Sequence, residues 1–248
     1  MQSVSPQYEA EEKITVNGNV DLYAVVFNRT TETDLTEDQL PQVDIYKYKQ
    51  VIFVGDSRTE FMENVLTGMG ESATKNVKFV CFGRKGTGLV YHYRMGSALF
   101  HSTARFQQYS FKETAVIFNF GVNDLSKSAD YAEYYNWIAP QLKSKGCELY
   151  FMSVNPVNRL MLPNAGRADR SEAAVRSFNQ YMKANLSSAY TYIDMYSYLK
   201  STGYSFASDH YGTGTVDDGL HYTTRTYKRI LQMYGFIESA CLTKWQRA

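Results

Sequence analysis

The sequence of 248 residues has no long hydrophobic run, only three cysteines and no block of charge of one sign. Its apolar runs, such as residues 51–54 and 115–118, are far shorter than the roughly 20 residues that a membrane-spanning helix needs, so we expect no membrane insertion. The 26 basic and 25 acidic residues give a net charge of +1, which argues against a nucleic-acid-binding surface. A neutral or mixed-polarity small-molecule partner is the more natural expectation.

The three cysteines cannot all pair within the chain. Cys81 and Cys147 lie in strand-like apolar runs and Cys241 lies near the end of a helix-like one, and their spacing matches no zinc site. We interpret all three as small core residues. Tyrosine, by contrast, is abundant, with 21 residues. Tyrosine suits half-wet surfaces and sugar faces, although a general preference of the proteome explains the number equally well.

The first 48 residues differ from the rest, and we predict that residues 1–48 form an extension ahead of a domain at residues 49–248. Residues 14–27 alternate like two strands around an Asn-Gly turn, which indicates a small hairpin or edge strand. Residues 28–42 are polar and acidic and contain a proline near their end, so they are predicted to be a linker.

The same segment, residues 14–27, resembles the closing part of the Listeria-Bacteroides type repeat of bacterial surface proteins, in which a Leu-Tyr-Ala strand ends each unit. The resemblance implies a bacterial parent protein that is secreted or attached to the cell surface. The first five residues are polar and carry no signal-peptide core. Because the sequence opens so abruptly, we expect the parent protein to extend further upstream.

From residue 46 onward, strand-like apolar runs alternate with helix-length segments. The predicted strands are residues 51–54, 77–82, 115–120, 148–153 and 190–194. The predicted helices are residues 59–69, a less regular span at 89–109, and residues 131–145, 171–188 and 223–244. Alternation of this kind favours right-handed βαβ units. We therefore predict an α/β fold, a flavodoxin-like three-layer αβα sandwich with a parallel five-stranded sheet in the order 2-1-3-4-5.

Ser57 stands where the first predicted strand turns into a helix. The strand ends in Gly55, which lets the chain turn sharply, followed by Asp56 and Ser57. Ser57 is thus expected at the carboxyl edge of the sheet, where open α/β sheets bind their ligands. A structural alternative is that Ser57 only caps the helix, because residues 57–60 read Ser-Arg-Thr-Glu and fit a capping box.

Three further motifs are expected at the same edge. The glycines of residues 83–88 free backbone amides that can donate to an oxyanion, although a flexible turn also explains them. Asn123 follows the third strand and offers a carboxamide donor, or it is simply a turn residue. His221 can serve as a general base if a carboxylate orients its ring, and otherwise it is an ordinary polar residue before a helix. Asp218 lies three residues before it and Asp217 four, and we favour Asp218.

These motifs, in this order, resemble the blocks of the SGNH or GDSL hydrolase family across roughly residues 48–240. The matching positions are Gly55-Asp56-Ser57, Gly86, residues 121–124, which read Gly-Val-Asn-Asp, and residues 218–221, which read Asp-Gly-Leu-His. The resemblance implies a serine esterase with a catalytic triad. In that triad Ser57 is the nucleophile, His221 is the base and Asp218 orients the base.

The resemblance also implies an oxyanion hole and no metal or organic cofactor. Its donors are the amides of Ser57 and Gly86 and the side chain of Asn123. The sequence departs from the family pattern at two places. Arg58 stands where the family's name expects leucine, and the glycine block is degenerate, so Gly83 could take the role of Gly86.

The predicted reaction is hydrolysis of a short-chain acyl ester, because no long apolar lid segment is present. We predict that Arg58, Tyr91 and Asn155 contact the substrate, since they follow the serine, the glycine run and the fourth strand. Aromatic rings with hydrogen-bonding neighbours suit sugars, so removal of acetyl groups from a glycan is the leading hypothesis. Two alternatives are a non-catalytic carbohydrate-binding module of the cell surface on the same fold, and an acyltransferase that uses the same serine.

Overall fold

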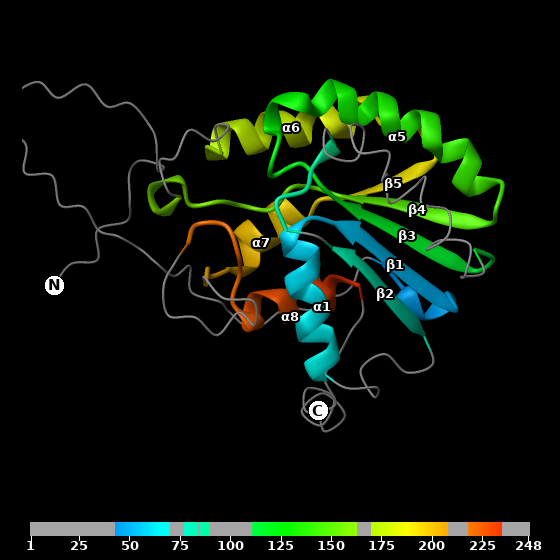
Figure 1. Ribbon diagram of the computed structural model, residues 1–248, viewed down its shortest axis with the longest axis horizontal. Helices are drawn as coiled ribbons and strands as arrows, with labels where there is room; N and C mark the ends of the chain where they lie inside the picture. The colour runs from blue at the N-terminus through cyan, green and yellow to red at the C-terminus, as the bar shows by residue number, and fades with distance from the viewer. Residues whose placement is uncertain are drawn as a thin grey trace, which may run out of the picture.

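The computed structural model describes residues 43–69, 77–83, 85–89, 111–162, 170–207 and 218–234. Within these residues a five-stranded sheet lies between two layers of helices (Figure 1). Several sequence predictions fall outside the described residues: the hairpin and repeat resemblance at 14–27, the linker at 28–42, and the residues Tyr91, Asp217 and Cys241.

All five strands come from the predicted apolar runs. They are β1 (Gln50–Gly55), β2 (Lys78–Gly83), β3 (Thr114–Asn119), β4 (Cys147–Met152) and β5 (Tyr190–Ile193). Every neighbouring pair is parallel and the order is β2-β1-β3-β4-β5, so the predicted fold class and strand order are confirmed. β1 and β3 are buried along their whole length because helices cover both faces of the sheet.

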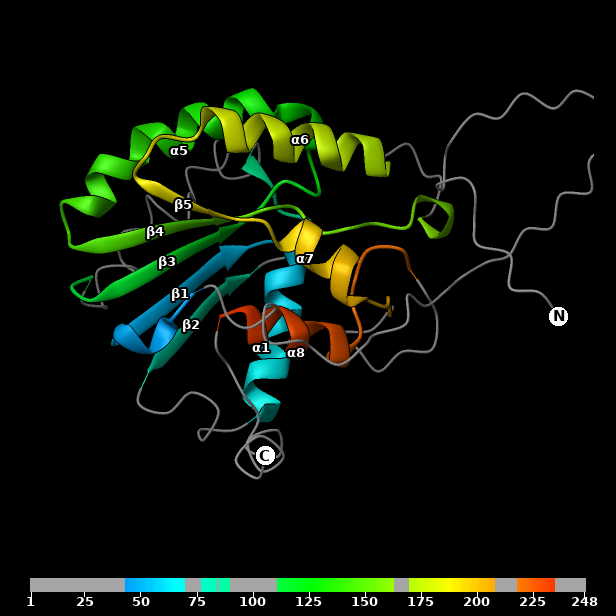
Figure 2. The same cartoon turned by 180° about the vertical axis from the view of Figure 1, so that it is seen from behind.

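The helices divide between the two faces of the sheet (Figures 1 and 2). One face carries α5 (Ser128–Lys143) and α6 (Glu172–Asn185), and the other carries α1 (Ser57–Met69), α7 (Met195–Thr202) and α8 (Thr224–Met233). Short 3-10 turns are η2 (Ile45–Lys47), η3 (Leu125–Lys127) and η4 (Arg159–Met161). The helix predicted at residues 89–109 lies outside the described residues apart from Leu89.

Helix α7 was not predicted from the sequence, although both of its ends carry a signal. Asp194 caps its start by accepting a hydrogen bond from the Ser197 amide. Gly203 follows its end with a φ of 89°, a conformation that favours glycine. A helix of eight residues is too short for its apolar periodicity to stand out.

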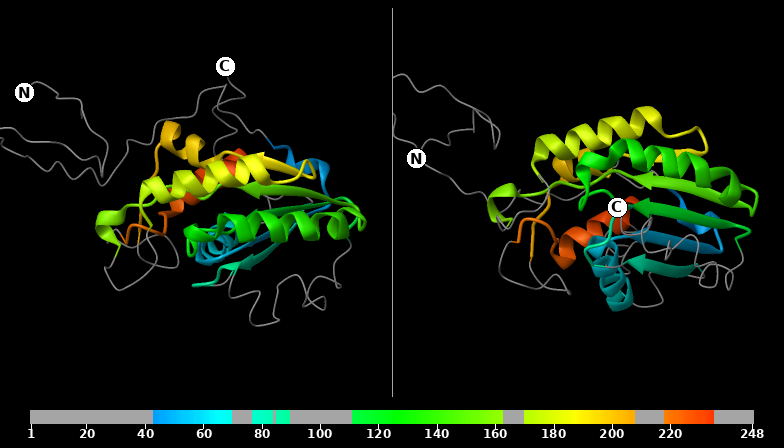
Figure 3. Two further views of the ribbon diagram at one scale, coloured as in Figure 1. Left: turned by 90° about the horizontal axis from the view of Figure 1, so that it is seen from above. Right: turned by 45° about the horizontal axis from the view of Figure 1, so that its top comes forward.

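Alternate residues of each strand build two cores, one on each face of the sheet. In β1, Ile52 and Val54 pack with α5 and α6, whereas Val51 and Phe53 pack with α1, α7 and α8. The views in Figure 3 show the sheet between these layers. Both helix layers are therefore anchored on the same strands, and the loops that follow the strands are held at one edge.

The residues just before β1 pack into the second of these cores. Val43, Ile45 and Tyr48 are all buried there. The predicted boundary between extension and domain falls at the end of this buried stretch. The division into an extension and a domain stays a prediction, because residues 1–42 lie outside the described residues.

Several tyrosines and two cysteines are part of the two cores. Tyr131 and Tyr135 of α5 are fully buried, so they offer no surface to a sugar. Cys147 is buried and Cys81 is half-buried, both as free thiols, in agreement with their prediction as core residues. Among the described helices, none combines the length and the hydropathy that a membrane crossing requires.

Gly83, the last residue of β2, lies directly against the first turn of α1. A Cβ at this position would be only 2.2 Å from the backbone nitrogen of Glu60. The helix that follows Ser57 can therefore approach β2 only because Gly83 has no side chain.

We expect Gly83→Ala to lower the free energy of unfolding by about 3 kcal/mol, because the new methyl group meets backbone atoms that cannot move aside cheaply. The matched control is Gly68→Ala, near the end of α1, where an added Cβ meets nothing within 4 Å. That variant should gain about 0.5–1 kcal/mol, since alanine is the better helix former. Urea denaturation of both variants measures the difference, and equal stabilities would contradict the packing described here.

Candidate active site

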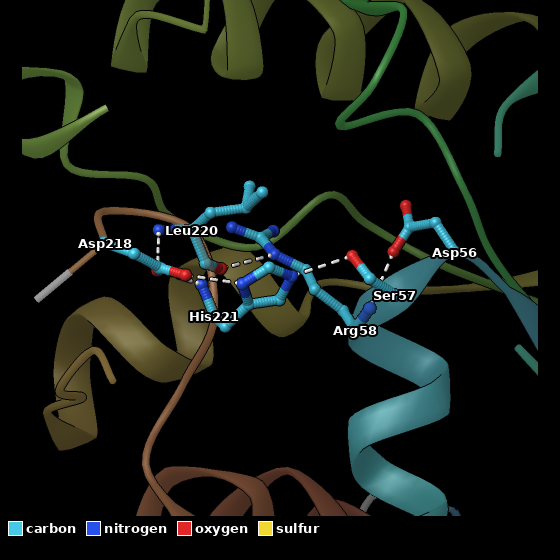
Figure 4. A network of polar contacts seen from close by, with 6 residues as sticks. All are labelled: Asp56, Ser57, Arg58, Asp218, Leu220 and His221. Carbon is cyan, nitrogen blue, oxygen red and sulfur yellow. Dashed lines mark hydrogen bonds and ion pairs between the residues drawn. The ribbon is translucent and has the colours of Figure 1, made fainter. Parts of the chain in front are cut away.

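Ser57 begins α1 at the carboxyl end of β1, where the sequence predicts it. Its side chain points out of the helix start toward His221, and the distance from Ser57 Oγ to His221 Nε2 is 2.8 Å (Figure 4). Gly55 makes the turn possible, because a Cβ there would lie 2.5 Å from the carbonyl oxygen of Asn119 in the neighbouring strand.

The structure does not favour the alternative that Ser57 only caps the helix. Asp56 does this instead, since its Oδ1 accepts a hydrogen bond from the Arg58 amide at 2.9 Å. The backbone oxygen of Asp56 also accepts from the amides of Thr59 and Glu60, each at 3.1 Å. Because Asp56 satisfies the helix start, the Ser57 hydroxyl is left for His221.

The capping-box partner, Glu60, also acts differently from the expectation. Its Oε2 accepts a hydrogen bond from the Lys85 amide at 2.9 Å. Glu60 therefore holds the glycine loop after β2 beside the start of α1. Its spacing of three from Ser57 signals a first-turn carboxylate, but the sequence alone could not identify a donor amide 25 residues away.

His221 lies between Ser57 and Asp218. Its Nδ1 is 2.6 Å from Asp218 Oδ2, and its backbone amide donates to Asp218 Oδ1 at 2.8 Å. A carboxylate can only accept, so Nδ1 carries the proton and Nε2 is left to accept from the Ser57 hydroxyl. The structure thus brings together the three residues that the sequence predicts as a group.

The charge of Asp218 is stabilised by its neighbours. Burial opposes this charge, but hydrogen bonds from the ring and amide of His221 and from the amide of Leu220 outweigh it. They hold the pKa of the Asp218 carboxyl below its ordinary value. Asp218 therefore stays an acceptor for the His221 ring at neutral pH.

The segment that carries His221 is fixed on both sides. The Gly219 carbonyl accepts from the Asn158 amide at 2.9 Å, and Gly219 has a φ of +70° in a place where a Cβ would meet the Asn158 oxygen at 2.2 Å. On the other side, Tyr222 forms an antiparallel bridge with Phe206. The His221 ring also packs on Phe61, one turn after Ser57 on α1, with ring centroids 4.3 Å apart.

Asn123 connects the loop after β3 to the glycine loop. Its Nδ2 donates to the Thr87 carbonyl at 2.8 Å, and its Oδ1 accepts from Arg170 Nη2 at 2.7 Å. The neighbouring Asp124 accepts from the Leu89 amide at 2.9 Å. Arg170 was not identified from the sequence, because nothing in its local pattern distinguishes it from a surface arginine.

Of the two glycines considered for an oxyanion amide, Gly86 has the more suitable setting. Gly83 ends a strand and is pressed against α1. Gly86 lies in the following turn, is exposed and has a φ of +68°. The residue after it, Thr87, is the one held by Asn123. The three proposed oxyanion donors therefore come from adjacent loops.

The structure does not support Arg58 as a substrate contact. The side chain is 2% exposed, and its guanidinium donates to backbone carbonyls of the protein itself. Asn155 is also buried, and among the described residues neither its Oδ1 nor its Nδ2 has a hydrogen-bond partner. Tyr91, the third predicted contact, lies outside the described residues. In the described part of the chain, no three His, Cys, Asp or Glu side chains gather as metal ligands would.

Comparison with known proteins places this geometry in context. A family model described as GDSL-like lipase/acylhydrolase matches residues 51–232. A search of curated proteins finds no match. The chain aligns with the crystal structure of an acetyl xylan esterase at a TM-score of 0.52 and 14% identity, covering 75% of this chain and 97% of that one. It aligns with an α/β-hydrolase enzyme from the metagenome of Lake Arreo, Spain, at a TM-score of 0.50 and 14% identity, over 77% and 97% of the two chains. At these identities, each of the two alignments shows a fold that is shared with this chain.

Asp56 makes stability depend on pH. Burial raises the pKa of the Asp56 carboxyl to about 6 from its ordinary value of 3.8, although the Arg58 charge acts in the opposite direction. The folded protein thus binds this proton more tightly than the unfolded chain. The contribution of Asp56 to the free energy of unfolding is therefore present at low pH and is lost as the pH rises from about 4 to about 6.

We expect Asp56→Asn to remove this loss, because asparagine cannot ionise and its oxygen can still accept from the Arg58 amide. From about pH 4 to about pH 7, the stability of the variant relative to wild type should rise by up to about 3 kcal/mol. Urea denaturation across that range measures it, with Asp130→Asn on the exposed side of α5 as control. If the curves of Asp56→Asn and wild type run parallel, the pKa of Asp56 is not raised.

Proposed function

Because the chain belongs to the GDSL-like lipase/acylhydrolase family, we propose that it is a serine esterase that removes short acyl groups, chiefly acetyl, from a carbohydrate. The observation that carries the proposal is the unbroken hydrogen-bond chain from Ser57 through His221 to Asp218. Nucleophile, base and orienting carboxylate are arranged as this chemistry requires. The comparisons establish the family, and the roles of the individual residues are proposed from the distances.

In the first half of the proposed reaction, Ser57 Oγ attacks the ester carbonyl carbon while its proton passes to His221 Nε2. The carbonyl π electrons move to the oxygen and give a tetrahedral oxyanion. When this collapses, the bond from carbon to the alcohol oxygen breaks, and His221 gives its proton to the leaving alcohol. Asp218 stabilises the imidazolium that exists between these two transfers.

In the second half, water attacks the acyl group on Ser57, and His221 takes a proton from the water. The second tetrahedral intermediate collapses with cleavage of the bond to Ser57 Oγ. His221 returns its proton to that oxygen, and the carboxylic acid leaves. The free enzyme is restored, so one ester and one water give one alcohol and one acid.

The proposed oxyanion hole consists of the amides of Ser57 and Gly86 and the Nδ2 group of Asn123. One hydrogen of Nδ2 is directed to the Thr87 carbonyl, and the second is the proposed donor to the substrate oxygen. Arg170 donates to the other end of the same amide, which fixes its orientation. A charged donor on Oδ1 also polarises the amide and strengthens its N–H groups as donors.

The carbohydrate part of the proposal has two supports. The fold is shared with an acetyl xylan esterase at 14% identity. In addition, Asn155 follows β4 with a buried amide that has no hydrogen-bond partner among the described residues, and because such groups are exceptional in folded proteins we assign this one to the substrate. We also propose a secreted or cell-surface location, from the repeat resemblance of residues 14–27.

Ser57→Ala tests the reaction itself. We expect this variant to fold as the wild type does and to lose at least about 10⁴-fold in turnover of p-nitrophenyl acetate, because no other nucleophile replaces the hydroxyl. The control is Ser144→Ala, at an exposed serine after α5, which should keep full activity. Acetate release from acetylated xylan, chitin fragments and peptidoglycan, compared between wild type and Ser57→Ala, identifies the acyl donor.

Retained turnover in Ser57→Ala would remove the nucleophile assignment. A wild-type protein that binds glycans, hydrolyses no ester and does not react with a fluorophosphonate probe would be the binding module instead. Transfer of the acyl group to an added alcohol in preference to water would identify an acyltransferase.

Asn155→Leu tests the substrate contact. The free enzyme should gain about 1 kcal/mol in the free energy of unfolding, because a buried polar group without a partner is replaced by an apolar group of similar size. Activity on an acetylated oligosaccharide should fall by about tenfold, whereas activity on p-nitrophenyl acetate should change little. Chemical denaturation and the two kcat/KM values provide the measurement. A loss of stability, or equal effects on both substrates, would remove Asn155 from the substrate site.

A further inference from the structure

Arg58 is a buried cation directly after the proposed nucleophile. It occupies the first turn of α1 and is 2% exposed. None of the hydrogen bonds that its guanidinium makes within the described residues goes to a carboxylate. All of them go to backbone carbonyl oxygens, so the side chain connects segments of main chain.

The three carbonyls belong to two loops at the carboxyl edge of the sheet. Nη1 donates to the Asn155 oxygen at 3.0 Å and Nη2 to the Pro156 oxygen at 2.9 Å, both in the loop after β4. Nε donates at 2.9 Å to the oxygen of Leu220, in the segment that carries His221. A planar guanidinium offers donors in several fixed directions, which is why a single side chain can serve both loops.

Both residues that flank His221 contact Arg58. Leu220 provides the carbonyl that accepts from Nε, and the ring of Tyr222 lies under the guanidinium, with Cζ 4.9 Å from its centroid. Figure 4 shows the Arg58 side chain passing beside the His221 ring to reach Leu220. The main chain on each side of the imidazole is therefore tied to the residue next to Ser57.

We propose that Arg58 is a positioning residue that sets the distance between Ser57 Oγ and His221 Nε2. The inference rests on the proposed function, because it assigns Arg58 a purpose only if Ser57 and His221 perform the chemistry. The two groups are 164 residues apart in the sequence, so their separation depends on contacts between segments. A displacement of about 1 Å in such a pair can reduce the rate by about 100-fold.

The position also explains why leucine would not serve here. A leucine side chain has no donor, and the carbonyls of Asn155, Pro156 and Leu220 would lose their shared partner. Lysine keeps the charge but concentrates it at one atom, which cannot bond three carbonyls in different directions. Arg58→Ala and Arg58→Lys therefore separate the need for this geometry from the need for a charge.

The experiment measures kcat and KM for p-nitrophenyl acetate, together with the rate of labelling by a fluorophosphonate probe. All variants are assayed well below their melting temperatures. For Arg58→Ala we expect kcat to fall by about 10- to 100-fold with KM within about threefold of wild type, and labelling to slow by the same factor as kcat. For Arg58→Lys we expect a loss of about tenfold.

The control is Arg229→Ala. Arg229 is another buried arginine, on α8, and it donates to the backbone carbonyl of Thr202. This variant should lose thermal stability and keep the wild-type kcat. It shows what the loss of a purely structural arginine does to this fold.

The proposal is overturned if Arg58→Ala is folded and keeps kcat within about twofold of wild type, or if its loss lies entirely in KM, which would make Arg58 a substrate contact. If Arg58→Ala does not fold, an unchanged kcat in Arg58→Lys overturns the proposal in the same way. Failure of the proposed function gives a different result, because Ser57→Ala then retains activity or the wild type has none.

Discussion

The hydrogen bond between Ser57 and His221 joins two segments 164 residues apart, and the rest of the structure is arranged around holding it. The parallel sheet makes the meeting possible, because all its strands end at one edge and their loops share one space. Contacts between these loops then fix their positions relative to one another. Gly219 docks on Asn158, Asn123 holds the glycine loop, and Arg58 connects α1 to both neighbours of His221.

Two carboxylates, one behind the His221 ring and one next to Ser57, have pKa values shifted in opposite directions. Asp218 receives hydrogen bonds from the ring and amide of His221, and its pKa is lowered. Asp56 is fully buried, and its pKa is raised to about 6 in spite of the nearby Arg58. The first is suited to stabilise a cation that forms during a reaction. The second satisfies a helix start, and by doing so leaves the serine hydroxyl free of a capping role.

Much of the architecture could be predicted from the sequence, because the strands are short apolar runs separated by helix-length segments. The group of Ser57, Asp218 and His221 could also be predicted, since each lies in a motif with a local pattern. The contacts of Arg58 could not be predicted, because its partners are backbone carbonyls, which look alike in every sequence. The hydrogen bond from the Lys85 amide to Glu60 and the one from Arg170 to the Asn123 side chain could not be predicted either, because these contacts exist only once distant loops have met.

His221 lies near the end of the domain, and this affects the order in which the protein folds during synthesis. A ribosome releases the chain from its amino terminus, so the sheet and the turn at Ser57 emerge long before the segment that bears the imidazole. Within the described residues that segment adds no strand to the sheet, but Tyr222 and α8 complete one of its two cores. A nascent chain can thus pair its five strands before His221 reaches the Ser57 hydroxyl. Under the proposed function, hydrolysis begins only after this last segment has packed.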